Sequence, residues 1–233
     1  MRIRDLNWMQ VRKYLASDDR AVLPLGSTEQ HGYLSLSTDS ILSERVAVEA
    51  AEPTGVLVFP ALAYGITPNY VDFPGSISIK IETYLRFIGD ILEGLVRQGF
   101  RRILFVNGHG GNCPVEYFLP EWLTGRSDVA IKFHNWYKGP KMWQKVMSLD
   151  PVAYHASWVE NFPWNRLAAV TLPAEKKEIV DMARLRTQGP GKARDILGDG
   201  NYGGRYQASD QEMMEIWQIA VMETRELMEG EWR

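Results

Sequence analysis

The chain places two carboxylates and one imidazole close together, just after a short apolar run at residues 21–25. These side chains are Glu29, His31 and Asp39, within the segment PLGSTEQHGYLSLSTD. Imidazole and carboxylate ligands together suit zinc, manganese or iron better than magnesium or calcium, which prefer oxygen ligands alone. The segment therefore predicts a site for a divalent metal at the end of a buried strand.

A glycine-rich turn at residues 107–112 follows a second apolar run and carries His109. Its sequence, NGHGGN, looks superficially like a phosphate-binding loop. However, Cys113 stands where the dinucleotide fingerprint needs a glycine, and no lysine followed by serine or threonine completes a P-loop. We interpret the glycines as residues that let the backbone approach a metal or substrate closely while His109 points at the ion.

A third segment, HASWVE at residues 155–160, adds another imidazole and another carboxylate. Open α/β sheets bind ligands at the carboxyl ends of their strands, so we expect the three segments to meet there. His155 is the candidate proton shuttle, because the ordinary pKa of histidine suits proton transfer near neutral pH. We expect Glu160 to act in catalysis as well as in metal binding.

Together the three segments offer more metal ligands than one catalytic zinc uses, since such a zinc keeps about three protein ligands and a water. With three carboxylates among them, we expect two divalent cations bridged by Asp39 or Glu29, about 3.5 Å apart, with a hydroxide between them. Such a hydroxide would attack a polarised carbonyl. The five expected ligands are Glu29, His31, Asp39, His109 and Glu160.

Composition indicates a globular protein with a sizeable core, since 45% of the 233 residues are hydrophobic and 24% are charged. The net charge of −3 and the lack of a basic run give no basis for nucleic-acid binding. No apolar segment reaches membrane-spanning length, and residues 1–10 lack the apolar core of a signal peptide. The single cysteine, Cys113, makes a cytoplasmic location the default, and we interpret it as a packing residue rather than a nucleophile.

Apolar strands alternate with amphipathic helices along the chain, which indicates an α/β protein with a mostly parallel sheet covered by helices on both faces. No repeat or linker is visible, so we expect a single domain over residues 1–233. Residues 161–206 look rich in loops. The expected strands are 20–25, 56–59, 77–81, 102–106 and 129–133, and the expected helices are 7–16, 38–51, 82–98, 114–123, 141–147 and 210–228.

Four sequence blocks in combination resemble the signatures of the creatininase (creatinine amidohydrolase) family, from about residue 5 to at least residue 165. They are LGSTEQHG at 25–32, Thr38-Asp39, NGHGGN at 107–112 and HASWVE at 155–160. The resemblance implies a three-layer αβα sandwich, a homohexamer, and two metal ions that are zinc, manganese or, in some members, iron. It also implies hydrolysis of a small cyclic amide or formamide. By motif, the implied ligands are Glu29, His31, Asp39 and His109.

One departure from the family pattern bears on the substrate. Creatininase proper has a glutamate two residues after the histidine of the glycine turn, whereas Gly111 stands there in this chain. We expect Glu160 to supply that carboxylate, and the residues after it, Asn161 to Trp164, to alter the pocket wall. This argues against creatinine itself as the substrate.

Two other activities stay open. The first is ring opening of a diketo-inositol in carbohydrate catabolism, by a carbon–carbon hydrolase of the 3-dehydro-scyllo-inosose hydrolase type. The second is a catalytically inactive metal-binding module, which the complete set of ligands and the free histidine oppose. For five further residues, a place in the pocket and a packing or surface role remain alternatives: His134, Trp136, Trp158, Asp199 and Tyr202.

Overall fold

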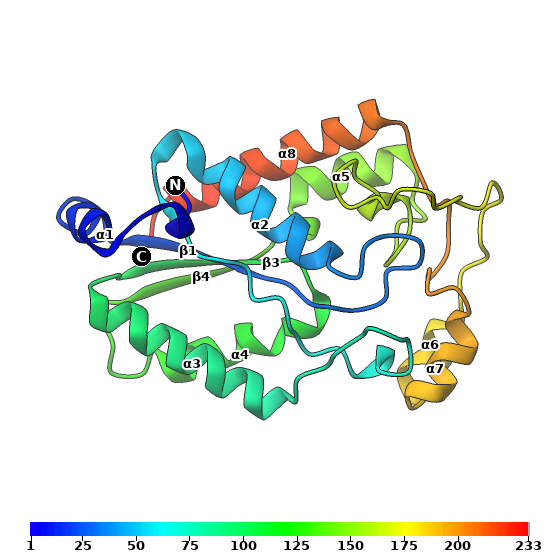
Figure 1. Ribbon diagram of the computed structural model, residues 1–233, viewed down its shortest axis with the longest axis horizontal. Coiled ribbons are helices and arrows are strands. Elements are labelled where there is room, and N and C mark those ends of the chain that lie inside the picture. The colour runs from blue at the N-terminus through cyan, green and yellow to red at the C-terminus, as the bar shows by residue number, and fades with distance from the viewer. Residues whose placement is uncertain (233) are drawn as a thin grey trace.

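Four parallel strands form the sheet of the computed structural model, which describes residues 1–232 (Figure 1). The strand order is β2-β1-β3-β4. Leu25 pairs with Asn107, and Asn107 pairs with Asn135, so three strands end level with one another. The residues that follow these strands therefore meet at one edge of the sheet. The bounds are β1 (Arg20–Leu25), β2 (Leu57–Val58), β3 (Arg102–Asn107) and β4 (Ala130–Asn135).

Helices cover both faces of this sheet, as Figure 1 shows. One layer holds α2 (Thr38–Ala51), α5 (Pro140–Leu149) and α8 (Asp210–Glu229), and the other holds α3 (Ile81–Gln98) and α4 (Pro114–Trp122). Alternate residues of the buried strands point to the two layers. Val22, Leu104 and Val106 pack with the first layer, whereas Leu23, Ile103 and Phe105 pack with the second. This arrangement confirms the expected three-layer α/β fold.

Three shorter helices lie outside these layers. Helix α1 (Trp8–Leu15) begins at Asn7, whose Oδ1 accepts the backbone N–H groups of two residues in the first turn at 3.1 Å. Helices α6 (Met182–Thr187) and α7 (Pro190–Leu197) lie beyond the sheet, at the right of Figure 1. They pack against the short turn Pro68–Tyr70 through a small apolar cluster of Tyr70, Leu185, Ala193 and Leu197.

One expectation about secondary structure was wrong. The alternating residues 77–81 do not form a strand, because only isolated pairings occur, between Ile77 and Thr28 and between Ser78 and Gly65. The segment 161–206 is rich in loops, as expected, and also contains the short helices α6 and α7, which the sequence analysis did not predict. The strand expected at 56–59 is present but has only two paired residues, Leu57–Val58.

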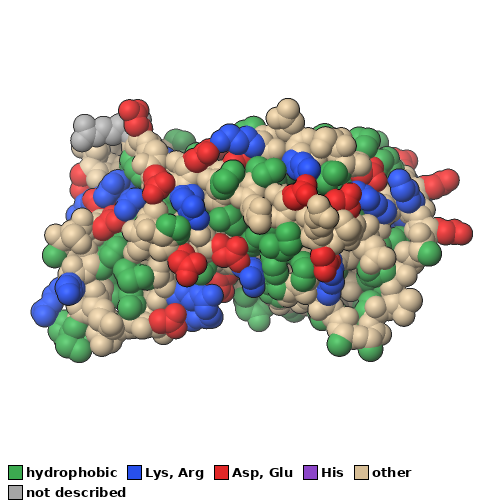
Figure 2. Space-filling view, turned by 90° about the horizontal axis from the view of Figure 1, so that it is seen from above, with side chains coloured by type: hydrophobic (Ala, Val, Ile, Leu, Met, Phe, Trp, Pro, Cys, Tyr) green, Lys and Arg blue, Asp and Glu red, His purple; other side chains and the backbone are tan. Residues whose placement is uncertain are grey.

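The surface over the first helical layer carries mixed charge. Figure 2 looks onto the molecule from that side and shows acidic and basic side chains interspersed, without a large area of one sign. On this face nothing resembles the basic stripe that binds nucleic acid. Within residues 1–232, no helix is both long and apolar enough to cross a lipid bilayer.

Candidate metal centre

The level carboxyl ends of β1 and β3 bring the sequence-predicted ligands to one place. Glu29 and His31 lie in the loop after β1, and Asp39 lies in the first turn of α2, where the helix dipole favours a negative charge. His109 follows β3 in the glycine turn. A Cβ at Gly111 would lie 1.9 Å from the carbonyl oxygen of Ile66, so only glycine lets this turn pack so closely.

Asp39 lies between two histidines and presents a different oxygen to each. Its Oδ1 is 3.0 Å from Nε2 of His31, and its Oδ2 is 3.0 Å from Nδ1 of His109. Glu160 Oε2 lies 3.8 Å from His31 Nε2, and Glu29 Oε1 lies 3.3 Å from His109 Nδ1. Three possible three-ligand groups result. Two of them share Asp39: Glu29, Asp39 and His109 form one, and His31, Asp39 and Glu160 form the other. The third consists of Glu29, His31 and His155.

Backbone contacts direct one ring nitrogen of each histidine into this cluster. His109 donates from Nε2 to the carbonyl of Ile66 at 2.8 Å, and His31 Nδ1 lies 3.3 Å from the carbonyl of Glu29. In both rings the other nitrogen then faces the carboxylates, which is the orientation of a metal-bound histidine. His31 Nε2 and Glu29 Oε2 are buried, and neither has a hydrogen-bond partner among residues 1–232. Buried polar atoms without partners are rare, so a cation fits this cluster well.

Neighbouring charges together outweigh burial in setting the pKa values of His31 and Asp39. Burial opposes charge on His31, yet the carboxylates of Asp39 and Glu160 raise its pKa to about 10. Burial also opposes ionisation of Asp39, but His31 and His109 hold its pKa well below the usual range. The three carboxylates therefore favour positive charge between them, which divalent cations would supply.

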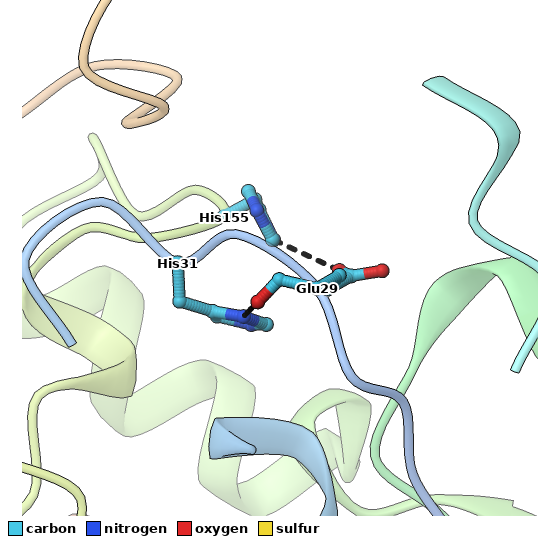
Figure 3. A group of neighbouring side chains, drawn as sticks. All are labelled: Glu29, His31 and His155. Carbon is cyan, nitrogen blue, oxygen red and sulfur yellow. Dashed lines mark hydrogen bonds and ion pairs between the residues drawn. The ribbon is translucent and has the colours of Figure 1, made fainter. Parts of the chain in front are cut away.

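His155 reaches the cluster from a segment far along the chain, as Figure 3 shows. Its Nδ1 lies 3.9 Å from Glu29 Oε1 and 4.0 Å from Glu160 Oε2. Burial, together with the charge of His31, lowers the pKa of His155 to about 4. Burial also raises the pKa of Glu160 to about 7. The structure thus places an uncharged imidazole beside the predicted ligands, with one nitrogen directed at them.

Three side chains to which the sequence analysis assigned no role support the cluster. Ser27 Oγ donates to Asp39 Oδ2 at 2.8 Å, and Nε2 of Gln30 lies 2.9 Å from Nε2 of His155. The ring of Tyr70 stacks on that of His155, with centroids 5.0 Å apart and an angle of 11° between the planes. Ser27 and Gln30 lie inside the first ligand-bearing segment, and this position was the signal that could have found them.

A cavity of about 790 Å³ opens onto the cluster. Trp136 and Tyr202 line it, which settles two of the residues that the sequence left open. The other three do not line the cavity. His134 is buried at the end of β4, Trp158 donates from Nε1 to the carbonyl of Val152 at 3.0 Å, and Asp199 accepts from the Tyr206 hydroxyl at 2.6 Å.

A family model described as "Creatininase: Creatinine amidohydrolase" matches residues 4–228. The chain belongs to the creatininase family. The expected family and the expected class of enzyme, a hydrolase, are thereby confirmed at the level of the family.

Curated relatives that are similar in sequence to this chain are named for different reactions. A 3-dehydro-scyllo-inosose hydrolase of Thermotoga maritima is 33% identical over 131 residues, which are 55% of this chain and 42% of that protein. A creatinine amidohydrolase of Pseudomonas putida is 33% identical over 117 residues, 47% of this chain and 45% of that protein. A mycofactocin precursor peptide peptidase of Mycobacterium tuberculosis is 41% identical over 102 residues, 39% of this chain and 40% of that protein. The chain thus spans less than half the length of each.

Solved creatininase structures share the fold over nearly the whole chain. A creatinine amidohydrolase (creatininase) matches with a TM-score of 0.78 and 22% identity, over 97% of this chain and 96% of that one. A structure described as "Creatininase Mn" gives a TM-score of 0.79 at 22% identity, over 99% and 98% of the two chains. A mutant creatininase of "Zn-Zn type" gives the same TM-score and identity over the same shares. At this identity the likeness establishes the fold.

Proposed function

We propose that this protein is a dinuclear metal-dependent hydrolase of a small cyclic amide or formamide. One cation would be held by Glu29, Asp39 and His109, and the other by His31, Asp39 and Glu160, with Asp39 shared. Zinc, manganese and iron suit this set of nitrogen and oxygen ligands.

The position of Asp39 is the observation that carries this proposal. Its two oxygens face His31 and His109 separately, each at 3.0 Å, which is the arrangement that a carboxylate bridging two cations requires. The buried Nε2 of His31 agrees with it, because this nitrogen makes no well-aligned hydrogen bond within residues 1–232 and faces the carboxylates of Asp39 and Glu160, as a metal ligand would. Ser27 holds the Asp39 carboxylate in place through its hydroxyl.

When bound, the cations would polarise a substrate carbonyl and lower the pKa of water, so that hydrolysis proceeds near neutral pH. The chain's own residues supply the remaining functions. His155 lies at the open side of the cluster and can carry a proton between the attacking water and the leaving group, since its Nδ1 faces the carboxylates of Glu29 and Glu160. The backbone N–H of Ala156 donates to Glu160 Oε2 at 2.6 Å and fixes that carboxylate.

The test is to measure metal content and turnover together. The protein, loaded with zinc, manganese or iron, is screened against lactams, formamides and cyclic diketones. Asp39→Asn, Glu29→Gln and His109→Ala should each lose metal and turnover while keeping the circular dichroism of the fold. Glu116→Gln, an exposed carboxylate on α4, is the matched control and should keep both. Full turnover by metal-free protein would overturn the proposal.

Carbon–carbon ring opening is the second candidate, and the Thermotoga maritima relative named for that reaction favours it. The same cluster could activate a ring ketone in place of an amide carbonyl. The screen separates the two by product. A lactam opens to a product that carries a new amino group and a formamide releases formate and an amine, whereas a cyclic diketone opens to a keto acid with no new amino group and no formate. A protein that binds two metals and turns over no compound of any class would favour the inactive metal-binding module.

Assembly and location also remain proposals. The family resemblance implies a homohexamer of this chain. The lack of a visible linker favours a single domain over residues 1–233, and the single cysteine favours the cytoplasm. Light scattering coupled to size-exclusion chromatography measures the number of 26.6 kDa chains directly. A monomer at micromolar concentration would remove the hexamer from this picture without affecting the metal centre.

A further inference from the structure

The charged residues that line the cavity form two groups, one acidic and one basic. All of its acidic residues, which are Glu29, Asp39 and Glu160, belong to the metal-ligand cluster. Its two cationic residues of the lysine and arginine type, Lys138 and Arg186, lie outside that cluster, and both are exposed. Within residues 1–232, neither of these two side chains forms an ion pair with a carboxylate.

Arg186 lines the cavity, and packing and capping contacts hold its helix, α6, in place. Leu185, the preceding residue of α6, is only 2% exposed and packs in the cluster that includes Tyr70. The Asp181 carboxylate caps the helix by accepting the N–H of Arg184 at 2.9 Å. Arg186 lines the same cavity as Tyr202 and as Met182, the first residue of its own helix.

Lys138 comes from a different part of the fold. It ends the short helical turn Trp136–Lys138 that follows β4, and its two neighbours in that turn also line the cavity. Its ammonium lies 5.6 Å from the centre of the Tyr137 ring. Much of the remaining lining of the cavity is aromatic or apolar, and includes Tyr70, Trp136, Trp143, Tyr154 and Met182.

From this division we propose that the substrate carries an anionic group, a carboxylate or a phosphate, separate from the carbonyl that is attacked. Arg186 binds that group, and Lys138 is the second cation available to it. A guanidinium matches both kinds of anion with two parallel hydrogen bonds. A cavity of about 790 Å³ leaves room for such an extension, since ligand pockets span about 300–1,000 Å³. This proposal rests on the proposed function, because it names the substrate class of the same site.

Turnover tests the proposal with a matched pair of formamides. N-formyl-L-phenylalanine carries a free carboxylate, and N-formyl-L-phenylalaninamide does not. We expect the metal-loaded protein to prefer the acid by about tenfold in kcat/KM, the effect of one charge-assisted hydrogen bond. Arg186→Gln should raise KM for the acid about tenfold and leave kcat/KM for the amide substrate unchanged. The preference for the acid in kcat/KM should therefore disappear. Lys138→Gln should have a smaller effect in the same direction.

Arg184→Gln is the control, because Arg184 lies in the same short helix, is exposed and does not line the cavity. It should leave both substrates unaffected. Equal kinetics of Arg186→Gln and Arg184→Gln on the acid would overturn the proposal. Circular dichroism and thermal unfolding of both variants establish that the comparison is made on folded protein.

A binding measurement separates this proposal from the proposed function. Calorimetry with 3-phenylpropionate, phenyl phosphate and 3-phenylpropan-1-ol needs no turnover, and the first two distinguish carboxylate from phosphate. We expect the anions to bind wild type and Arg184→Gln at least tenfold more tightly than Arg186→Gln, with an advantage that shrinks as salt is added. If turnover fails but this difference holds, the hydrolase assignment falls and the anion site stands. If turnover occurs and the variants bind alike, the anion site falls alone.

Discussion

The side-chain nitrogen of Gln30 lies 2.9 Å from Nε2 of His155. The amide of Gln30 is held at both ends, because its Oε1 accepts the N–H of Gly32 at 3.0 Å and its Nε2 donates to the carbonyl of Gly200 at 3.1 Å. These contacts fix the amide nitrogen against the imidazole. The backbone carbonyl of Gln30 also lies 3.1 Å from Nε2 of His155, and the other ring nitrogen is turned toward Glu29, at 3.9 Å.

Replacing Gln30 tests whether this contact orients His155. In Gln30→Leu we expect kcat to fall about tenfold with metal content unchanged, since proton transfer needs a positioned imidazole. In Gln30→Glu the added carboxylate favours the protonated ring, so the limb of the pH–activity profile that reports His155 should move to higher pH. Activity profiles and metal analysis of both variants provide the measurement. Profiles identical to that of wild type would show that Gln30 does not act through His155.

Gly200 gives an independent approach to the same contact. A Cβ at this position would lie 1.7 Å from Oε1 of Gln30, and the backbone φ of +96° disfavours any other residue. We expect Gly200→Ala to lower activity as Gln30→Leu does, and to lower the free energy of unfolding by about 1–3 kcal/mol. Gly55→Ala is the control, because φ there is +70° and nothing lies within 4 Å. Equal loss of activity in the two alanine variants would mean that backbone strain alone is responsible.

The sheet and its main helices could be predicted because local sequence dictates them. The runs that became β1 and β3 are continuously apolar, as strands buried on both faces must be. The failures lie where tertiary contacts decide. Residues 77–81 alternate because Ile79 packs under α3, although their backbone pairs at single points only. Helix α6, with six residues, is too short to show a period and is held by the cluster around Tyr70.

The clustering of the predicted ligands was accessible to sequence reasoning, because four of them follow β1 or β3 and Glu160 lies in the short motif that also carries His155. The residues that orient them were less accessible. Gln30 and His155 are separated by 125 positions, and no pattern in either segment predicts their contact. Tyr70 and Arg186 reach the cavity only because α6 folds against the turn at 68–70, which required the three-dimensional structure to see.

A buried carboxylate of α8 holds one wall of the cavity in place. Glu223 accepts the backbone N–H groups of Lys141 at 2.8 Å and Met142 at 2.9 Å, in the first turn of α5. This helix has no side-chain cap of its own and carries the cavity residue Trp143. Glu223 therefore satisfies N–H groups that would otherwise be buried without partners.

We expect Glu223→Gln to lower the free energy of unfolding by about 1–3 kcal/mol, because the amide offers one acceptor oxygen in place of two. Urea unfolding followed by circular dichroism measures the change. Glu226→Gln is the matched control, since Glu226 is exposed and, within residues 1–232, its carboxylate pairs only with the exposed ammonium of Lys141, at 2.7 Å. The free energy of unfolding of that variant should fall by less than about 1 kcal/mol. If both variants were equally stable, the role of Glu223 as a cap would be excluded.

His134 should make the folded protein sensitive to mild acid. Its side chain is 7% exposed on β4, and its Nε2 has no hydrogen-bond partner within residues 1–232. Burial lowers the pKa of His134 to about 4, below the value of 6.5 for a free histidine. Between these two pH values the unfolded chain takes up a proton and the folded chain does not. The stabilising effect of the neutral ring is therefore complete above pH 6.5 and is lost as the pH falls toward 4.

We expect His134→Leu to remove this loss, because leucine cannot be protonated and suits an apolar site. Between pH 6.5 and 4, the free energy of unfolding of wild type should fall by about 3 kcal/mol more than that of the variant. Urea unfolding at a series of pH values, with chelator present in all samples, measures the difference while the other titrating groups contribute equally to both proteins. Parallel pH curves for the two proteins would show that His134 takes up a proton as easily in the folded chain as in the unfolded one.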